Sequence, residues 1–118
     1  KGFSVSYSII PTPTFQKDVK NLKKKYRHIV TDLEELNDIL TGNPLYGDAI
    51  PGLDGKVFKL RLASSDMGKG KSGSFRVIYY LLAPDKTIYL LTIYAKAYKE
   101  DIDTSEIKAL LKKSGLWS

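Results

Sequence analysis

The sequence of 118 residues contains no cysteine and a single histidine, His28. Without cysteine the chain forms no disulfide, no thiolate metal site and no cysteine nucleophile, and this composition fits a reducing compartment. No set of His, Asp and Glu residues has the spacing of a metal site, so we expect neither a metal nor another cofactor. A catalytic pair of histidines is excluded as well, and we expect His28 to be a structural or surface residue.

Long hydrophobic runs are also missing. The longest, VIYYLLA at residues 77–83, is far shorter than the roughly 20 residues that a membrane-spanning helix needs. The first residues, KGFSVSYSII, lack the charged start, long apolar run and cleavage site of a signal peptide. Hydrophobic residues nevertheless make up 42% of the chain and charged residues 27%, a balance typical of globular proteins. At this length we expect residues 1–118 to form a single domain.

Positive charge exceeds negative charge, with 19 Lys and Arg against 13 Asp and Glu and a net charge of +6. The bases gather in residues 15–27 and 54–76, whereas residues 31–40 carry acids and no base. A basic protein favours an acidic partner such as nucleic acid, a phosphate-rich assembly or an acidic protein. Many basic domains bind no polyanion, however, so the net charge alone is weak evidence for such a partner.

The first third of the chain predicts a strand and a helix. Residues 3–10 alternate apolar residues with serine, the pattern of a half-buried strand, and Pro11 ends it. Thr12 can cap a helix that carries Pro13 at its first position. Apolar residues at helical spacing extend this helix and give it one buried stripe. They are Phe15, Val19, Leu22, Tyr26 and Ile29.

A second helix is predicted directly after the first. Thr31 and Glu34 form a capping box at its start, Gly42 suits its end, and residues 28–30 join the two helices into a hairpin. Residues 43–55 are rich in proline and glycine and predict a loop.

The rest of the chain predicts three strands and a final helix. The strands are rich in β-branched and aromatic residues and cover residues 56–64, 74–83 and 87–96. A tight turn at residues 83–87 joins the last two strands into a hairpin, and Asp103 with Glu106 predicts the start of the helix. The order β-α-α-β-β-β-α indicates an α+β fold, in which a helical hairpin packs on a largely antiparallel sheet.

The hairpin predicts which side chains meet across its two strands. If Ala83 lies opposite Thr87, Arg76 lies opposite Tyr94, and Lys96 points to the same face of the sheet. A slip of one residue would put Arg76 and Tyr94 on opposite faces.

Basic and phenolic side chains then crowd one end of the sheet. On the preceding strand Lys59 and Arg61 share a face, and the glycine-rich loop that follows this strand carries two more lysines. The candidate site residues are Arg61, Lys69, Lys71, Arg76, Tyr94 and Lys96. A plainer interpretation of the same pattern is solvated lysines, an ion-paired arginine and half-buried tyrosines.

The sequence resembles a known family at this end of the sheet. The stretches GKGKSGSFRVIYYL (68–81) and LLTIYAKAYKEDID (90–103) resemble the RelE/ParE superfamily of bacterial toxins. PLYGDAIPGLDGKVFKLRLA (44–63) is similar to its HigB-type branch. The resemblance extends over nearly the whole chain, with one departure: Ser74 stands where that branch usually has a glycine.

The resemblance implies a toxin of a type II toxin–antitoxin system in the bacterial cytoplasm, and it implies a RelE-like fold. Its activity would be that of a ribosome-dependent mRNA endonuclease (an mRNA interferase). Its partners would be a cognate antitoxin protein, the 70S ribosome with its mRNA, and operator DNA bound only through the toxin–antitoxin complex. No membrane is implied.

The candidate residues suit the chemistry that this resemblance implies. RNA supplies its own nucleophile, the 2′-OH, so the protein aligns it, moves two protons and stabilises negative charge. Arg61 and Arg76 suit the phosphate because guanidinium stays charged and binds two oxygens. A lysine among Lys69, Lys71 and Lys96 could act as base or acid. Tyr94 could transfer a proton or stack on an mRNA base.

Three other interpretations remain open. A ParE-like toxin poisons DNA gyrase and cuts no RNA. A basic ribosome- or RNA-binding module binds without producing new RNA ends. A catalytically decayed or engineered toxin is the third, and the departure at Ser74 is a mild sign of it.

Overall fold

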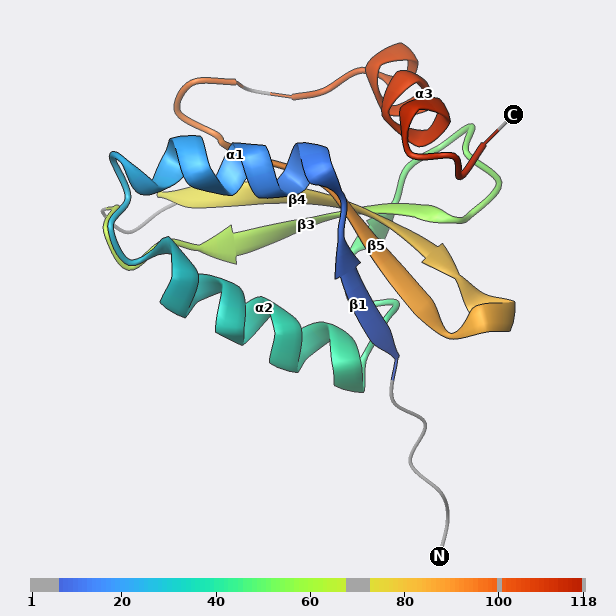
Figure 1. Cartoon of the computed structure of the whole chain (residues 1–118), viewed down its shortest axis with the longest axis horizontal. Coiled ribbons are helices and arrows are strands. Elements are labelled where there is room, and N and C mark those ends of the chain that lie inside the picture. The colour runs from blue at the N-terminus through green and yellow to red at the C-terminus, as the bar shows by residue number, and fades with distance from the viewer. Residues whose placement is uncertain (1–6, 68–72, 100, 118) are drawn as a thin grey trace, which may run out of the picture.

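The computed structural model describes residues 7–67, 73–99 and 101–117. Within these residues, a five-stranded sheet with the strand order β1-β5-β4-β3-β2 is flanked by three α-helices (Figure 1). The elements are β1 (Ser8–Pro11), α1 (Pro13–Lys23), α2 (Ile29–Gly42), β2 (Asp48–Ala49), β3 (Val57–Ala63), β4 (Ser74–Leu82), β5 (Thr87–Ala95) and α3 (Thr104–Lys113). None of the described helices is both long and apolar enough to cross a bilayer.

The sheet confirms the predicted α+β class. β1 pairs with β5 in parallel, and the other neighbouring strands pair antiparallel. The predicted element order lacked one strand, because β2 lies within residues 43–55, which we predicted to be a loop. Two residues are too short to show an alternating pattern, and β2 exists only through its pairing with the edge of β3.

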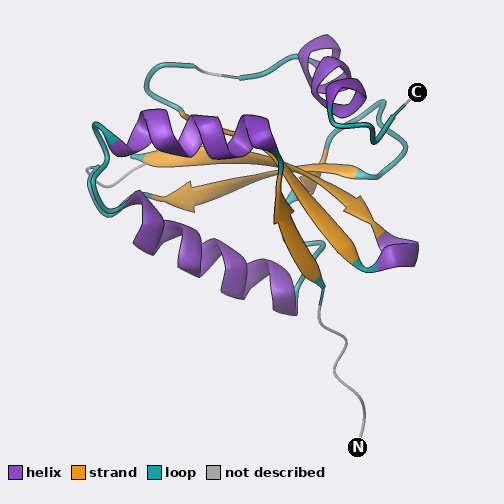
Figure 2. Ribbon diagram, in the orientation of Figure 1, coloured by secondary structure: helices purple, strands orange, loops and turns teal. Residues whose placement is uncertain are grey.

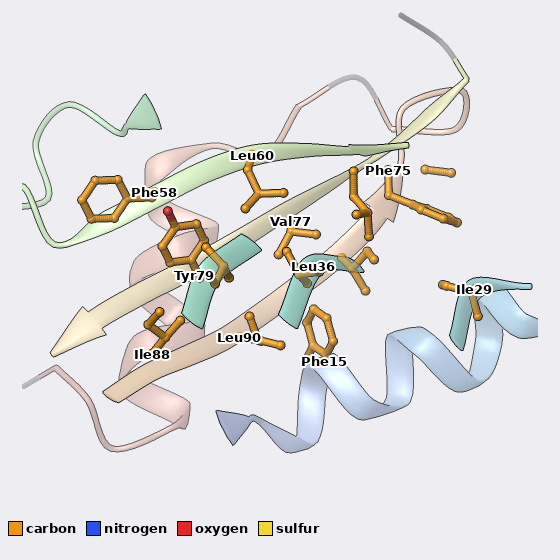
Figure 3. Packing of buried hydrophobic residues seen from close by; sticks show 14 of the residues in the cluster. Phe15, Ile29, Leu36, Phe58, Leu60, Phe75, Val77, Tyr79, Ile88 and Leu90 are labelled. Atoms are coloured by element: carbon orange, nitrogen blue, oxygen red, sulfur yellow. The ribbon is translucent and has the colours of Figure 1, made fainter. Parts of the chain in front are cut away.

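The strands separate two apolar clusters by the alternation of their side chains. Phe58 and Leu60 of β3 pack with residues of α1 and α2 (Figure 3), and Leu62 belongs to the same cluster, whereas Val57 packs with α3. Figure 2 shows α1 and α2 along the sheet and α3 apart from them, after a long connection. Each fully buried aliphatic side chain contributes about 1.5–3 kcal/mol relative to an exposed one, so both faces of the sheet stabilise the fold.

The start of α1 confirms the prediction, but its end does not. Thr12 is the N-cap and accepts a hydrogen bond from the backbone N–H of Phe15 at 3.3 Å. The helix ends at Lys23 rather than Ile29. Tyr26 and Ile29 are buried as the spacing predicted, yet a turn carries Tyr26 into the core.

The predicted capping box at Thr31 is wrong, as is a linker at residues 28–30. α2 begins at Ile29 with His28 as its N-cap, so Thr31 lies inside the helix. The carboxylate of Asp66 accepts the backbone N–H of His28 at 2.7 Å and contacts the His28 ring Nδ1 at 2.6 Å. A contact from a residue 38 positions away therefore sets the start of α2, which no local pattern could reveal.

The β4–β5 hairpin differs from the prediction at its turn and agrees with it at its open end. Leu82, rather than Ala83, lies opposite Thr87, because a short 3₁₀ helix and a left-handed Lys86 make a longer turn. A β-bulge then shifts the register by one residue between Ile78 and Tyr79. The shift restores the predicted pairing at the open end of the hairpin.

Tyr79 fastens the loop before β2 to the sheet. Its hydroxyl donates to the carbonyl of Pro44 at 2.8 Å and accepts from the backbone N–H of Gly47 at 2.9 Å. A Cβ at Gly47 would lie 2.9 Å from the carbonyl oxygen of Lys59, so only glycine fits this close approach. The loop is thereby held against β3 beside Lys59.

We expect Tyr79→Phe to lower the free energy of unfolding by about 1–3 kcal/mol, because it removes two hydrogen bonds, to the part-buried Gly47 N–H and Pro44 carbonyl, that each contribute about 0.5–1.5 kcal/mol. Urea unfolding of the purified protein measures this change. Tyr46→Phe, at an exposed tyrosine of the same loop, is the matched control and should change little. Equal stabilities of the two variants would contradict this role of Tyr79.

Candidate active site

Three of the predicted residues form a row across the sheet. Arg61 of β3 pairs directly with Arg76 of β4, and Arg76 pairs directly with Tyr94 of β5. Directly paired residues point to the same face of a sheet, so the three side chains stand side by side. We call Arg61, Arg76 and Tyr94 the active-site row, after the role that we propose for these residues below. It lies on the face that α3 partly covers, since Tyr94 belongs to the apolar cluster of α3.

Arg76 is a buried cation in the middle of the row, with only 8% of its surface exposed. Its Nη1 donates to the Ser74 hydroxyl at 2.5 Å and to the carbonyl of Phe75 at 3.5 Å. Burial lowers the pKa of Arg76, and the nearby charge of Arg61 lowers it further. Guanidinium still keeps its proton in proteins, so Arg76 is a cation in a site where a bound anion would be strongly stabilising.

Ser74, the departure from the HigB-type pattern, has a structural reason in this chain. It is almost fully buried, and its hydroxyl holds the Arg76 guanidinium two residues along the same strand. A glycine here could not make this contact. Ser74 therefore orients the central cation of the row.

Tyr94 is held by an acid that the sequence did not place in the site. Its hydroxyl donates to Asp101 Oδ1 at 3.5 Å, and Lys59 Nζ donates to the same oxygen at 3.2 Å. Burial, followed by the charge of Asp101, raises the pKa of Tyr94 to about 12. The phenol is therefore protonated at neutral pH and can give a proton but not take one.

The carboxylate of Asp101 is stabilised in its charged form. The backbone N–H of Ile102 donates to it at 2.9 Å, and this bond, with those from Lys59 and Tyr94, holds the pKa of Asp101 below its usual range. Asp101 therefore places an acid beside the basic residues of the row. It lies in a connection without a repeating pattern, so no sequence signal could have found it. Lys59 shares a face with Arg61 and could have been included from that alternation.

The other predicted site residues have different outcomes. Lys96 follows the last residue of β5, and its backbone N–H donates to the carbonyl of Ser74 at 3.2 Å, which continues the predicted pairing. Lys69 and Lys71 lie outside the described residues. The described residues thus bring together Arg61, Arg76 and Tyr94, with Lys96 at the end of the strand.

Open hollows lie beside the row. One of about 500 Å³ lies between β2, β3 and the start of α3, and another of about 340 Å³ lies between the loop before β2 and β3. Both are lined by Asp48 and Lys59, and the second reaches Arg61. Within the described parts of the chain, no three His, Asp or Glu side chains gather as a metal site would require. The polar groups at the row and its hollows are guanidinium, ammonium, phenol and the carboxylates of Asp48 and Asp101.

The family model of the RelE toxin of the RelE/RelB toxin–antitoxin system matches residues 20–117. The chain belongs to the RelE toxin family. The match does not distinguish branches, so the closer likeness to the HigB-type branch stays a prediction.

Two solved structures share the RelE fold with this chain. The E. coli toxin RelE, an arginine double mutant in the free state, is 14% identical with a TM-score of 0.56, over 80% of this chain and 88% of that chain. A chain of the toxin–antitoxin complex RelBE2 from Mycobacterium tuberculosis is 19% identical with a TM-score of 0.59, over 82% and 99%. The likeness at these identities shows the fold alone.

We expect Asp101→Asn to lower the pKa of Tyr94 in this RelE-family toxin. Removing the nearby negative charge makes the phenolate less unfavourable, whereas burial keeps the pKa above the ordinary value of about 10. An NMR titration of ring-labelled tyrosine measures the change. Asp85→Asn, at the opposite end of the β4–β5 hairpin, is the control. A Tyr94 pKa that stays near 12 in Asp101→Asn would show that Asp101 does not act on this phenol.

Proposed function

We propose that this toxin is a ribosome-dependent mRNA endonuclease that cuts translated mRNA in the A site and so inhibits translation. The observation that carries the proposal is the active-site row, in which two guanidinium groups and a protonated phenol stand on neighbouring strands. The resemblance of residues 68–81 and 90–103 to the RelE/ParE superfamily supports it, since both stretches contribute to the row.

The proposed reaction is the attack of an RNA 2′-oxygen on the adjacent phosphorus. A bond forms between the 2′-oxygen and phosphorus, and the bond from phosphorus to the 5′-oxygen breaks. The products are a 2′,3′-cyclic phosphate and a 5′-hydroxyl, and one proton leaves the 2′-OH while another reaches the 5′-oxygen. No metal takes part in this scheme.

The two arginines stabilise the charge that develops on the phosphate oxygens. Arg76 is buried and held by Ser74, so it is oriented before the substrate arrives, which is the condition for strong electrostatic catalysis. Arg61 is exposed and can approach a second oxygen of the same phosphate. Their mutual repulsion, part of the cause of the lowered Arg76 pKa, is relieved when an anion lies between them.

The protons are moved by different side chains. Tyr94 keeps its proton at neutral pH and is the proposed donor to the 5′-oxygen. The base is proposed to be a lysine, because lysine can lose its proton and arginine cannot. The candidates for the base are Lys59, which lies on the same face as Arg61, together with Lys69, Lys71 and Lys96.

RNA would displace the contact between Lys59 and Asp101. Both side chains are partly exposed, and ion pairs of this kind contribute only about 0–1 kcal/mol. A phosphate can therefore take the place of the carboxylate at Lys59 at little cost. We propose that the ribosome supplies the remaining alignment of 2′-oxygen, phosphorus and 5′-oxygen.

We also propose that a cognate antitoxin protein neutralises the toxin in the bacterial cytoplasm. The family is that of the toxin of the RelE/RelB system, and the similar M. tuberculosis structure is that of a toxin–antitoxin complex. A net charge of +6 favours an acidic antitoxin segment over the basic face. Operator DNA would be bound only by the complex.

We expect Arg76→Ala to reduce mRNA cutting about a hundredfold or more, the usual loss when one charge-stabilising donor is removed. The assay is a reconstituted translation reaction in which new RNA ends are counted. Arg27→Ala, which removes an exposed arginine between α1 and α2, is the matched control and should cut normally. Full activity of Arg76→Ala would overturn the site, and a wild type that blocks gyrase supercoiling but leaves mRNA intact would favour the ParE-like alternative.

Replacing Tyr94 with phenylalanine tests its role as proton donor. We expect Tyr94→Phe to cut ordinary mRNA about a hundredfold more slowly, in line with the usual contribution of acid catalysis. An mRNA with sulfur in place of the bridging 5′-oxygen should restore the rate, because a thiolate leaves without a proton. Arg76→Ala should gain no such rescue. Equal defects of Tyr94→Phe on both substrates would show that the phenol is not the acid.

A further inference from the structure

Beyond the residues that pair with β1, the outer edge of β5 is closed by α1 and its N-cap rather than by a strand. The described pairing of β1 with β5 ends where Pro11 lies opposite Leu90. Beyond that point the Thr12 hydroxyl donates to the carbonyls of Leu90 and Leu91 at 2.9 and 3.3 Å. Asp18, six residues further along the chain, continues the contact. Polar side chains of α1 thus satisfy backbone groups that a neighbouring strand would otherwise satisfy.

Asp18 binds the strand directly after its bulge. A single carboxylate oxygen, Oδ2, accepts the Thr92 hydroxyl at 2.5 Å and the Ile93 backbone N–H at 3.3 Å. Burial raises the pKa of Asp18, and the bonds from Thr92 and Ile93 work in the opposite direction. Asp18 is also the only acid among the basic residues 15–27. Its position against the sheet explains why an acid stands in this lysine-rich helix.

The bulge decides which residues face each other in the active-site row. Between the turn and the bulge, β4 and β5 keep one register, from the pair Leu82 and Thr87 to the pair Tyr79 and Leu90. The bulge leaves Leu91 without a paired residue in the described strand β4, and the register beyond it is shifted by one. Without that shift Arg76 would lie opposite Ile93, and Tyr94 would turn to the other face of the sheet.

We propose that Asp18 is a positioning residue for the active-site row, because its carboxylate holds the β5 bulge that keeps Tyr94 opposite Arg76. The consequence for cutting rests on the proposed function, whereas the consequence for register does not. Thr12, the N-cap of α1, contacts β5 at Leu90 and Leu91, and Asp18 within α1 contacts it at Thr92 and Ile93. These contacts couple α1 to the row, although α1 packs on the opposite face of the sheet.

The test compares Asp18→Ala, Asp18→Asn and the matched control Asp38→Ala, which removes an exposed acid from α2. NMR reports contacts between the Tyr94 ring and the Arg76 side chain, together with the pKa of Tyr94. In Asp18→Ala we expect these contacts to be lost and the Tyr94 pKa to fall from about 12 toward 10. Asp18→Asn should behave as the wild type, because one amide oxygen can accept both hydrogen bonds. Asp38→Ala should also be unchanged.

The cutting assay gives a second readout. We expect Asp18→Ala to lower kcat about a hundredfold, the usual effect of small misplacement of a reacting group, with the ribosome concentration at half-maximal rate unchanged. Asp18→Asn should restore kcat. Thr92→Val removes one of the two bonds while keeping the shape of the side chain, so it provides a smaller loss in the same direction if Asp18→Ala does not fold.

Two results would overturn the proposal. One is a folded Asp18→Ala, or a folded Thr92→Val, whose Tyr94 contacts and pKa match the wild type. The other is an Asp18→Asn variant as impaired as Asp18→Ala, which would mean that charge rather than hydrogen bonding matters. A wild type that cuts no mRNA would instead remove the proposed function, and the NMR comparison would still decide the role of Asp18.

Discussion

The pairing of β4 with β5 is the constraint on which the proposed site depends. It places Arg76 beside Tyr94, and the pairing of β4 with β3 adds Arg61 to the same row. Because side chains alternate between faces, a change of one residue in this register would remove the phenol from the cations altogether. The three residues of the row thus lie on the three central strands of the sheet.

The two faces of the sheet differ in what they contain. One face is covered by α1 and α2 and holds the larger apolar cluster, which stabilises the fold. The other face is shared between the apolar cluster of α3 and the polar row. This arrangement buries the charge of Arg76, which raises the free energy of the folded state unless the guanidinium is hydrogen-bonded. Ser74 and the carbonyl of Phe75 meet that requirement in the free protein, and in the proposed reaction the phosphate adds to it.

The sequence predicted the elements whose signals are local. Strands β3, β4 and β5, the Thr12 cap and the Asp103 cap follow from alternation, side-chain chemistry and turn residues. The start of α2, by contrast, depends on Asp66, and β2 depends on the edge of β3. Neither contact is indicated by a pattern in the neighbouring residues of the sequence.

The pairing of Arg76 with Tyr94 was predicted correctly although two details of the hairpin were not. The turn is one residue longer than expected, and the bulge at Leu91 compensates for that residue. Tertiary contacts accompany the bulge, from Thr12 to Leu90 and Leu91 and from Asp18 to Thr92 and Ile93, and no local pattern in β5 indicates it. The same holds for Asp101, whose place beside Tyr94 is set by the path of the connection to α3.

The most direct measurement of the central claim is the chemistry and position of the RNA ends made during translation. Purified toxin is added to a reconstituted reaction, with and without ribosomes, and both ends of each cut are mapped. The account predicts upstream fragments ending in a 2′,3′-cyclic phosphate and downstream fragments starting with a 5′-hydroxyl, in frame with the A site and only when ribosomes are present. Blocked protein synthesis with intact mRNA would contradict it and indicate a ribosome binder without catalysis.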